Sequence, residues 1–136
     1  MTSIDVAGVS VDTRHFIGGE RVASDTTFRN TSPIDGSFLG DIARGGQREV
    51  DLAVAAADAA FPVWGSMPPF ERAAVMNRIA DLVEQNLEQL AAVETMDNGA
   101  LLRSHLRGVM PRVAHNFRFF VDGRGNHLGH PDFETR

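Results

Sequence analysis

The chain has 136 residues, of which 43% are apolar and 23% charged, so it is long enough for one ordinary domain and its composition excludes wholesale disorder. Its net charge of −5 argues against a nucleic-acid partner, because phosphate binding needs a concentrated basic surface. The absence of cysteine excludes disulfides, thiolate metal sites and a thiol nucleophile.

Residues 1–14 are polar and mixed, and they predict a flexible arm. They lack the basic start and the continuous apolar run of a signal peptide. Nowhere does the chain approach the roughly 18 consecutive apolar residues of a membrane span. We therefore expect a cytoplasmic protein that has no membrane partner.

Residues 15–43 carry the turn and strand signals of a short antiparallel β element. Gly18-Gly19 indicates a tight turn between two strands. The segment Ser32–Gly36 indicates a second turn, since proline fixes φ and glycine accepts a positive φ. Phe38–Ala43 is then the returning strand. Such strands are marginally stable alone, so they need a packing partner.

Three helices are predicted next, over about 47–62, 69–97 and 101–121, and a loop tail over 122–136. Each helix carries apolar residues at steps of three or four, the pattern of a buried stripe. The stripe residues are Val50, Val54, Ala57 and Phe61 in the first helix, Val75, Ile79, Leu82, Val83 and Leu90 in the second, and Leu106, Val109, Met110, Val113, Phe117, Phe120 and Val121 in the third.

Proline, asparagine and glycine mark the irregular points of these helices. Pro62 limits the extension of the first helix, and the second is expected to bend near Asn86. Asn98 or Gly99 can adopt the left-handed conformation that ends the second helix. Pro111 either starts the third helix or kinks it.

Two groups of polar side chains are candidates for binding. His127 and His130 are three residues apart, but we interpret them as an exposed loop pair because no rigid element fixes their geometry. Arg103, Arg107 and Arg118 could clamp a phosphate or a carboxylate. The alternative for these arginines is a solvated or interface face.

Five short segments occur in a fixed order, and together they carry a resemblance to a known family. They are Phe16–Glu20, Asn30–Gly36, Phe61–Trp64, Glu71-Arg72 and Glu94–Gly99. Their order resembles the opening of an aldehyde dehydrogenase subunit. The resemblance implies an α/β fold of the aldehyde dehydrogenase type. Residues 15–136 would be its amino-terminal segment, a short antiparallel β element followed by three main helices and lacking the Rossmann strands.

The resemblance also implies a chemistry, the oxidation of an aldehyde to a carboxylic acid with NAD or NADP. The family's nucleophilic cysteine, general-base glutamate, cofactor-binding lysine and glycine-rich turn have no counterpart here. We therefore expect no catalytic or cofactor-binding residue in this chain, which alone would be inactive and would bind no NAD. Residues 116–122 look most like those of branches acting on hydroxymuconic-type semialdehydes or related small aldehydes.

The expected partner is the remainder of such a subunit, or a second copy of the chain in an oligomer. The alternative is a non-catalytic helical interaction module, or a complementing module from a truncated gene.

Many family members hold a structural monovalent cation, K+ or Na+. By this resemblance its ligands would be the backbone carbonyls of Asn30 and Thr31 and the carboxylate of Asp97, since oxygen ligands suit a hard cation. The alternative is that Asp97 only caps a helix or turn.

Overall fold

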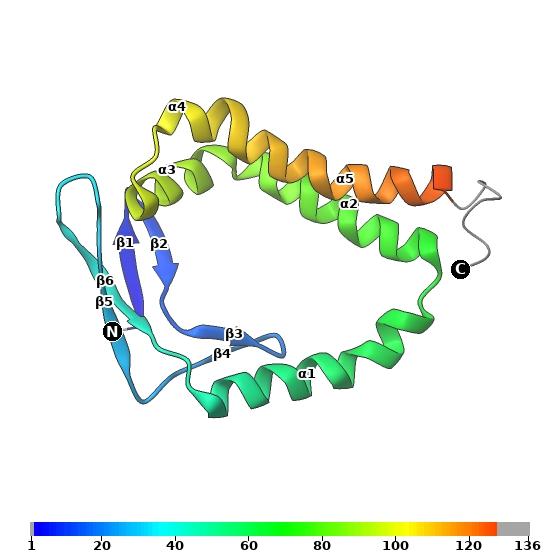
Figure 1. Cartoon of the computed structure of the whole chain (residues 1–136), viewed down its shortest axis with the longest axis horizontal. Coiled ribbons are helices and arrows are strands. Elements are labelled where there is room, and N and C mark those ends of the chain that lie inside the picture. Colours follow the sequence, from blue (N-terminus) through cyan, green and yellow to red (C-terminus); the bar gives the residue numbers. More distant parts are fainter. Residues whose placement is uncertain (1, 128–136) are drawn as a thin grey trace. The chain divides into compact units, whose positions relative to one another are not determined.

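The structure is a computed structural model that describes residues 2–127, with side chains up to residue 121. Three antiparallel hairpins precede the helices (Figure 1). Contacts divide the chain into two units. The first runs to Ser66 and includes Ala92–Leu101, and the second comprises Met67–Ala91 and the described residues from Leu102 onward.

Six strands form the hairpins. They are β1 (Ser3–Val6) with β2 (Val9–Asp12), β3 (His15–Ile17) with β4 (Glu20–Val22), and β5 (Thr27–Thr31) with β6 (Phe38–Ala43). The predicted Gly18-Gly19 turn joins β3 to β4, with φ of 60° and 87°, the positive values that glycine accepts without strain. Ala56 of the first helix lies against this turn, 3.6 Å from the position of a Cβ built on Gly18.

The prediction of a flexible arm over residues 1–14 is wrong, because β1 and β2 form a hairpin there. Ile4 packs so closely on Gly40 of β6 that a Cβ built on Gly40 would lie 2.6 Å from Ile4 Cδ1. The Ala43 amide donates to the carbonyl of Thr13, which extends the attachment beyond β2. Of the two left-handed residues of the turn, Gly8 (φ 79°) is a glycine but Ala7 (φ 54°) is not, and a non-glycine residue is uncommon in that conformation.

Up to residue 127, the helical part contains five segments of α-helix and one π-helical turn. They are α1 (Gln47–Ser66), α2 (Pro69–Gln85), α3 (Leu87–Asn98), α4 (Leu102–Ser104), the π-helical η1 (His105–Val109) and α5 (Met110–His127). The first helix continues past Pro62 to Ser66, so this proline removes one backbone hydrogen bond without ending the helix.

The second predicted helix divides where a bend was expected. Asn86 adopts φ −111° and ψ 19°, and its side-chain amide donates to the carbonyl of Leu82 at 2.8 Å. The Asn86 backbone amide also donates to the Leu82 carbonyl, at 3.1 Å, so the division of α2 from α3 lies in the non-helical dihedral angles of Asn86.

The third predicted helix continues through Pro111 by means of the π-turn. The Met110 amide donates to the carbonyl of His105, five residues back, directly before the proline that has no amide hydrogen. The helix then extends to His127, so residues 122–127 are helical and the predicted loop tail is wrong over that range. The rest of that tail, including His130, lies outside the described residues.

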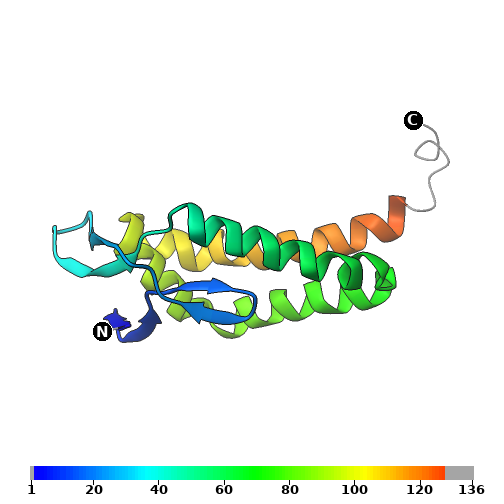
Figure 2. The same ribbon diagram turned by 90° about the horizontal axis from the view of Figure 1, so that it is seen from below.

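In the second unit, α2 and α5 lie side by side (Figures 1 and 2). Ala80 on α2 and Ala114 on α5 are fully buried, and such small side chains allow two helices to approach closely. Arg118 on α5 joins the same two helices through Asp81 and Glu84, at 2.6–2.8 Å.

The apolar stripes are less buried than their periodicity predicts. Of the predicted stripe residues only Met110 is buried, whereas Val75, Leu82 and Val109 are each more than 40% exposed. Periodicity shows which face of a helix is apolar, but burial also requires a surface to cover that face.

Candidate functional site

Two of the three residues predicted to bind a cation are in contact in the first unit, through their side chains. The Asn30 side chain on β5 donates from Nδ2 to Asp97 Oδ1 near the end of α3, at 2.6 Å. Thr31 follows Asn30 and is exposed. The structure thus places Asp97 against the strand that carries the other two residues, 67 positions earlier in the sequence.

A bulge lies at the same point of the β5–β6 ladder. Asn30 pairs with Gly40 but Thr31 pairs with Phe38, so β6 has an extra residue between the two pairs. A bulge leaves the extra residue unpaired and bends the strand locally. The regular ladder is therefore interrupted at the two residues whose carbonyls were predicted to be ligands.

Gly99 ends α3 next to the turn Ser32–Gly36, which follows β5. Its φ is 77°, and its amide donates to the Thr95 carbonyl at 2.9 Å, which is the left-handed helix end predicted at Asn98 or Gly99. A Cβ built on Gly99 would lie 2.9 Å from Pro33 Cγ. Only glycine permits both this φ and this close approach.

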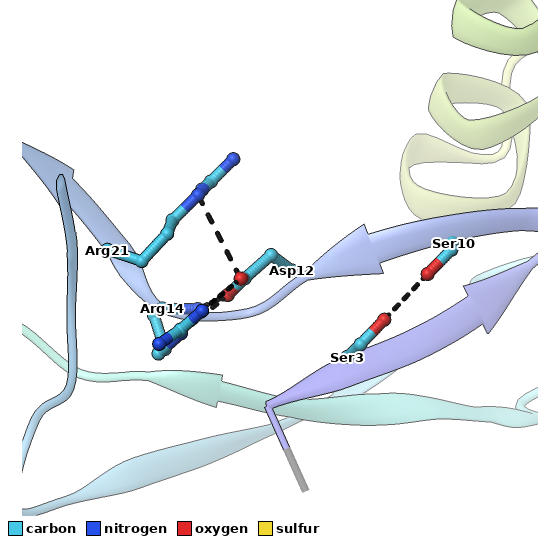
Figure 3. Close-up of polar contacts among 5 residues, drawn as sticks. All are labelled: Ser3, Ser10, Asp12, Arg14 and Arg21. Atoms are coloured by element: carbon cyan, nitrogen blue, oxygen red, sulfur yellow. Dashed lines mark hydrogen bonds and ion pairs between the residues drawn. The ribbon is translucent and has the colours of Figure 1, made fainter. Parts of the chain in front are cut away.

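Asp12, Arg14 and Arg21 form an ionic cluster in the first unit that was not predicted from the sequence. Arg14 donates from Nε and Nη2 to the two carboxylate oxygens of Asp12, at 3.0 and 2.6 Å, and Arg21 Nε lies 3.9 Å from the same carboxylate (Figure 3). The side-chain and backbone hydrogen bonds from Arg14 hold the pKa of Asp12 well below its usual range. In the same view Ser3 and Ser10 share a 2.7 Å hydrogen bond across the β1–β2 hairpin.

The start of α1 is held by Glu49. Its Oε2 accepts the Gly46 amide at 2.8 Å, and this backbone hydrogen bond is the main reason that the pKa of Glu49 is lowered. The arrangement is one half of a capping box, in which the third helical residue reaches back to the amide before the helix. The Asp12 cluster and the Glu49 cap both stabilise the first unit. Neither contains the nucleophile and the base that covalent catalysis requires.

An open depression of about 1000 Å³ lies in the second unit around η1 and the start of α5. It is lined by Ser104, Arg107, Gly108, Val109, Pro111, Arg112, Val113 and His115. Of the predicted anion clamp, Arg107 lies in this depression, whereas Arg118 is bound to Asp81 and Glu84. The predicted trio therefore does not form one clamp.

Among residues 2–121, whose side chains the structure describes, no group of three or more His, Cys, Asp and Glu side chains is placed to hold a metal ion. Over residues 2–127, no helix is long and apolar enough to span a membrane.

Comparison with known proteins identifies the family. The sequence model of the Aldehyde dehydrogenase family matches residues 21–130, most of the chain. The chain belongs to the aldehyde dehydrogenase family. The short hairpins and following helices also superpose on solved members of this family, as the resemblance implied.

The relatives are much longer proteins. The chain is 43% identical to the Escherichia coli 5-carboxymethyl-2-hydroxymuconate semialdehyde dehydrogenase over 79% of the chain and 23% of that relative. It is 46% identical to an aldehyde dehydrogenase of Paracoccus denitrificans over 79% of the chain and 22% of that relative. The chain thus spans less than a quarter of the length of these two relatives.

The chain also covers only about a quarter of the length of solved structures of the family. HpcC from Thermus thermophilus superposes with a TM-score of 0.80 and 37% identity, over 90% of the chain and 26% of HpcC. An indole-3-acetaldehyde dehydrogenase of P. syringae, solved in complex with NAD+, gives a TM-score of 0.83 and 33% identity over 87% of the chain and 25% of that protein.

Proposed function

We propose that this chain is the amino-terminal portion of an aldehyde dehydrogenase subunit, which oxidises an aldehyde to a carboxylic acid with NAD(P)+. The observation that carries the proposal is a match over 79% of this chain to less than a quarter of its relatives. A semialdehyde is the favoured substrate, because relatives in E. coli and Bos taurus are a 5-carboxymethyl-2-hydroxymuconate and a 2-aminomuconic semialdehyde dehydrogenase.

The chain alone is proposed to be inactive. In the family reaction a cysteine thiolate attacks the aldehyde to form a thiohemiacetal, hydride passes to NAD(P)+, and water hydrolyses the resulting thioester. This chain has no cysteine to perform the attack. The reactive and cofactor-binding groups would come from the remainder of the subunit.

The role proposed for this portion is structural. The surface proposed to contact the remainder of the subunit is the apolar face of α1. Of the 20 residues of α1 only Glu49 is buried. The side chains of Val50, Val54 and Phe61, predicted to form its buried stripe, are 54%, 54% and 71% exposed. An apolar stripe of this kind is costly to leave in water, so we propose that it packs against the remainder of the subunit. The alternative occupant is a second copy of the chain.

We also propose that the complete subunit holds K+ or Na+ through the carbonyls of Asn30 and Thr31 and the Asp97 carboxylate. Among the described residues no hydrogen bond reaches Asp97 Oδ2, which leaves this oxygen for an ion. The thermal midpoint should rise when choline chloride is replaced by KCl or NaCl at equal ionic strength. Asp97→Asn should abolish the rise, and an equal rise in the variant would contradict the assignment.

Two observations test the function. We expect the reading frame beyond Arg136 to continue into a segment that contains a nucleophilic cysteine, whereas a stop codon there would favour the interaction-module alternative. The purified chain should reduce neither NAD+ nor NADP+ in the presence of 5-carboxymethyl-2-hydroxymuconate semialdehyde or acetaldehyde. Reduction of either cofactor by the pure chain would contradict the proposal that the chain alone is inactive.

Light scattering after size-exclusion chromatography tests the structural role. The free chain should self-associate or unfold readily, because the apolar side chains of α1 are exposed among the residues that the structure describes. A stable monomer that unfolds cooperatively would contradict that role.

A further inference from the structure

The end of α3 carries a pair of residues that can react with each other. Of the six asparagines in the chain, only Asn98 is followed by a glycine. Asn98 and Gly99 are both exposed, so water reaches them. Asparagine is a thermolabile residue, and a following glycine has no side chain to keep its backbone nitrogen away from the asparagine carboxamide. The pair is therefore a candidate for deamidation, a covalent change that needs neither an enzyme nor a cofactor.

The reaction uses only atoms of these two residues and of water. The Gly99 nitrogen, after losing its proton to hydroxide, attacks Cγ of Asn98. The new N–Cγ bond forms as the Cγ–Nδ2 bond breaks, and Nδ2 takes a proton from water and leaves as ammonia. Water then opens the resulting succinimide ring. Opening at Cγ gives aspartate, whereas opening at the backbone carbonyl gives isoaspartate, which adds one carbon to the main chain.

Three hydrogen bonds hold the reacting groups away from this geometry. The Gly99 amide donates to the Thr95 carbonyl at 2.9 Å, which directs its proton into the helix. Nδ2 of Asn98 donates to Glu94 Oε1 at 2.9 Å, and Oδ1 of Asn98 accepts the Ala100 amide at 2.8 Å. Attack on Cγ requires the Gly99 bond to break and the side chain to turn, so the end of α3 must open before the reaction.

We propose that Asn98 is a deamidation site controlled by the end of α3. Its side chain remains an amide while Gly99 closes the helix, and it is converted to aspartate or isoaspartate when that end opens. The inference is independent of the proposed function, because every reacting group belongs to this chain or to water.

The product favours the open end of α3. An aspartate at position 98 has a carboxylate oxygen where Nδ2 now donates to Glu94, so two negative charges face each other. A carboxylate at the carboxyl end of a helix is also disfavoured by the helix dipole. An isoaspartate lengthens the main chain directly before Gly99 and disturbs its close approach to Pro33. Each product therefore weakens the contact between α3 and the turn Ser32–Gly36.

The test is peptide mapping by mass spectrometry after the full chain has been incubated in mildly alkaline buffer, with and without enough urea to unfold it. Deamidation of Asn98 should be at least tenfold slower in the folded chain, a factor that corresponds to an opening free energy of about 1.4 kcal/mol. In urea, Asn30 and Asn77 should react more slowly than Asn98, because threonine and arginine follow them.

Two glutamate variants test the side-chain hydrogen bond. Glu94→Ala removes the acceptor of Asn98 Nδ2 and should speed deamidation of the folded chain about three- to fivefold. The matched control is Glu88→Ala, which removes the same charge from an exposed position in the first turn of α3. It should leave the rate unchanged. Far-UV circular dichroism of each variant confirms that its helices are retained.

Three results would overturn the proposal: no conversion of Asn98 in urea, equal rates in urea and in a chain whose helices are intact, or equal rates in Glu94→Ala and Glu88→Ala.

Discussion

Gly99→Ala tests how the end of α3 is held against Pro33, in the turn that follows Asn30 and Thr31 of β5. Two costs combine at this position. A positive φ of 77° costs an alanine about 1–2 kcal/mol. The new Cβ would lie 2.9 Å from Pro33 Cγ, and relieving that contact costs about 1 kcal/mol more. We expect the free energy of unfolding to fall by about 2–3 kcal/mol.

The matched control separates the two costs. Gly36 has a similar φ of 73°, but nothing lies within 4 Å of a Cβ built on it. Gly36→Ala should therefore cost only the strain, about 1–2 kcal/mol. Adding Pro33→Ala to Gly99→Ala should recover about 1 kcal/mol, because it removes the ring atom that the new methyl meets.

Urea unfolding followed by circular dichroism at 222 nm measures these differences. Equal costs for Gly99→Ala and Gly36→Ala, with no recovery in the double variant, would refute the reasoning. In that case the end of α3 would not be held against Pro33.

The remaining predictions concern charge and packing. The pKa of Asp12 is lowered in the folded protein. Its carboxylate therefore stabilises the fold at pH values above its unfolded-state pKa, and this stabilisation is lost as the pH falls through its folded-state pKa. Thermal midpoints below about pH 4 should therefore fall more steeply in the wild type than in Asp12→Asn, and parallel curves would contradict this. Arg118→Met should lower the thermal midpoint, and the loss should shrink in 1 M NaCl because these ion pairs are partly exposed and screened. A salt-independent loss would assign the effect to packing instead. Ala114→Leu should cost about 1–3 kcal/mol in urea unfolding, since Ala114 is fully buried where α5 meets α2. A neutral result would show that the two helices can separate.

Features that depend on local chemistry could be predicted from the sequence. The Gly18-Gly19 turn, the bend at Asn86 and the helix end at Gly99 each follow from the backbone preferences of the residues present. The fold class was also predicted, through the ordered segments that resemble the family. The cation ligands remain a prediction, although the structure joins Asn30 to Asp97.

Features that depend on distant residues, or on residues in conformations that their type disfavours, could not be predicted. Arg118 pairs with Asp81, which lies 37 positions earlier in the sequence, and no local sequence pattern predicts this pair. The hairpin of β1 and β2 was missed because Ala7 takes a conformation usually left to glycine. The extension of α5 beyond residue 121 was missed because Gly123 and Gly125 favour a loop, yet the helix continues through them.

The central claim is that this chain supplies one structural portion of an aldehyde dehydrogenase. The most direct measurement is NADH formation at 340 nm by a chimera of the E. coli 5-carboxymethyl-2-hydroxymuconate semialdehyde dehydrogenase, with its matching segment replaced by this chain. We predict NAD+-dependent oxidation of that semialdehyde by the chimera and none by the chain alone. A folded, soluble chimera without activity would contradict the claim.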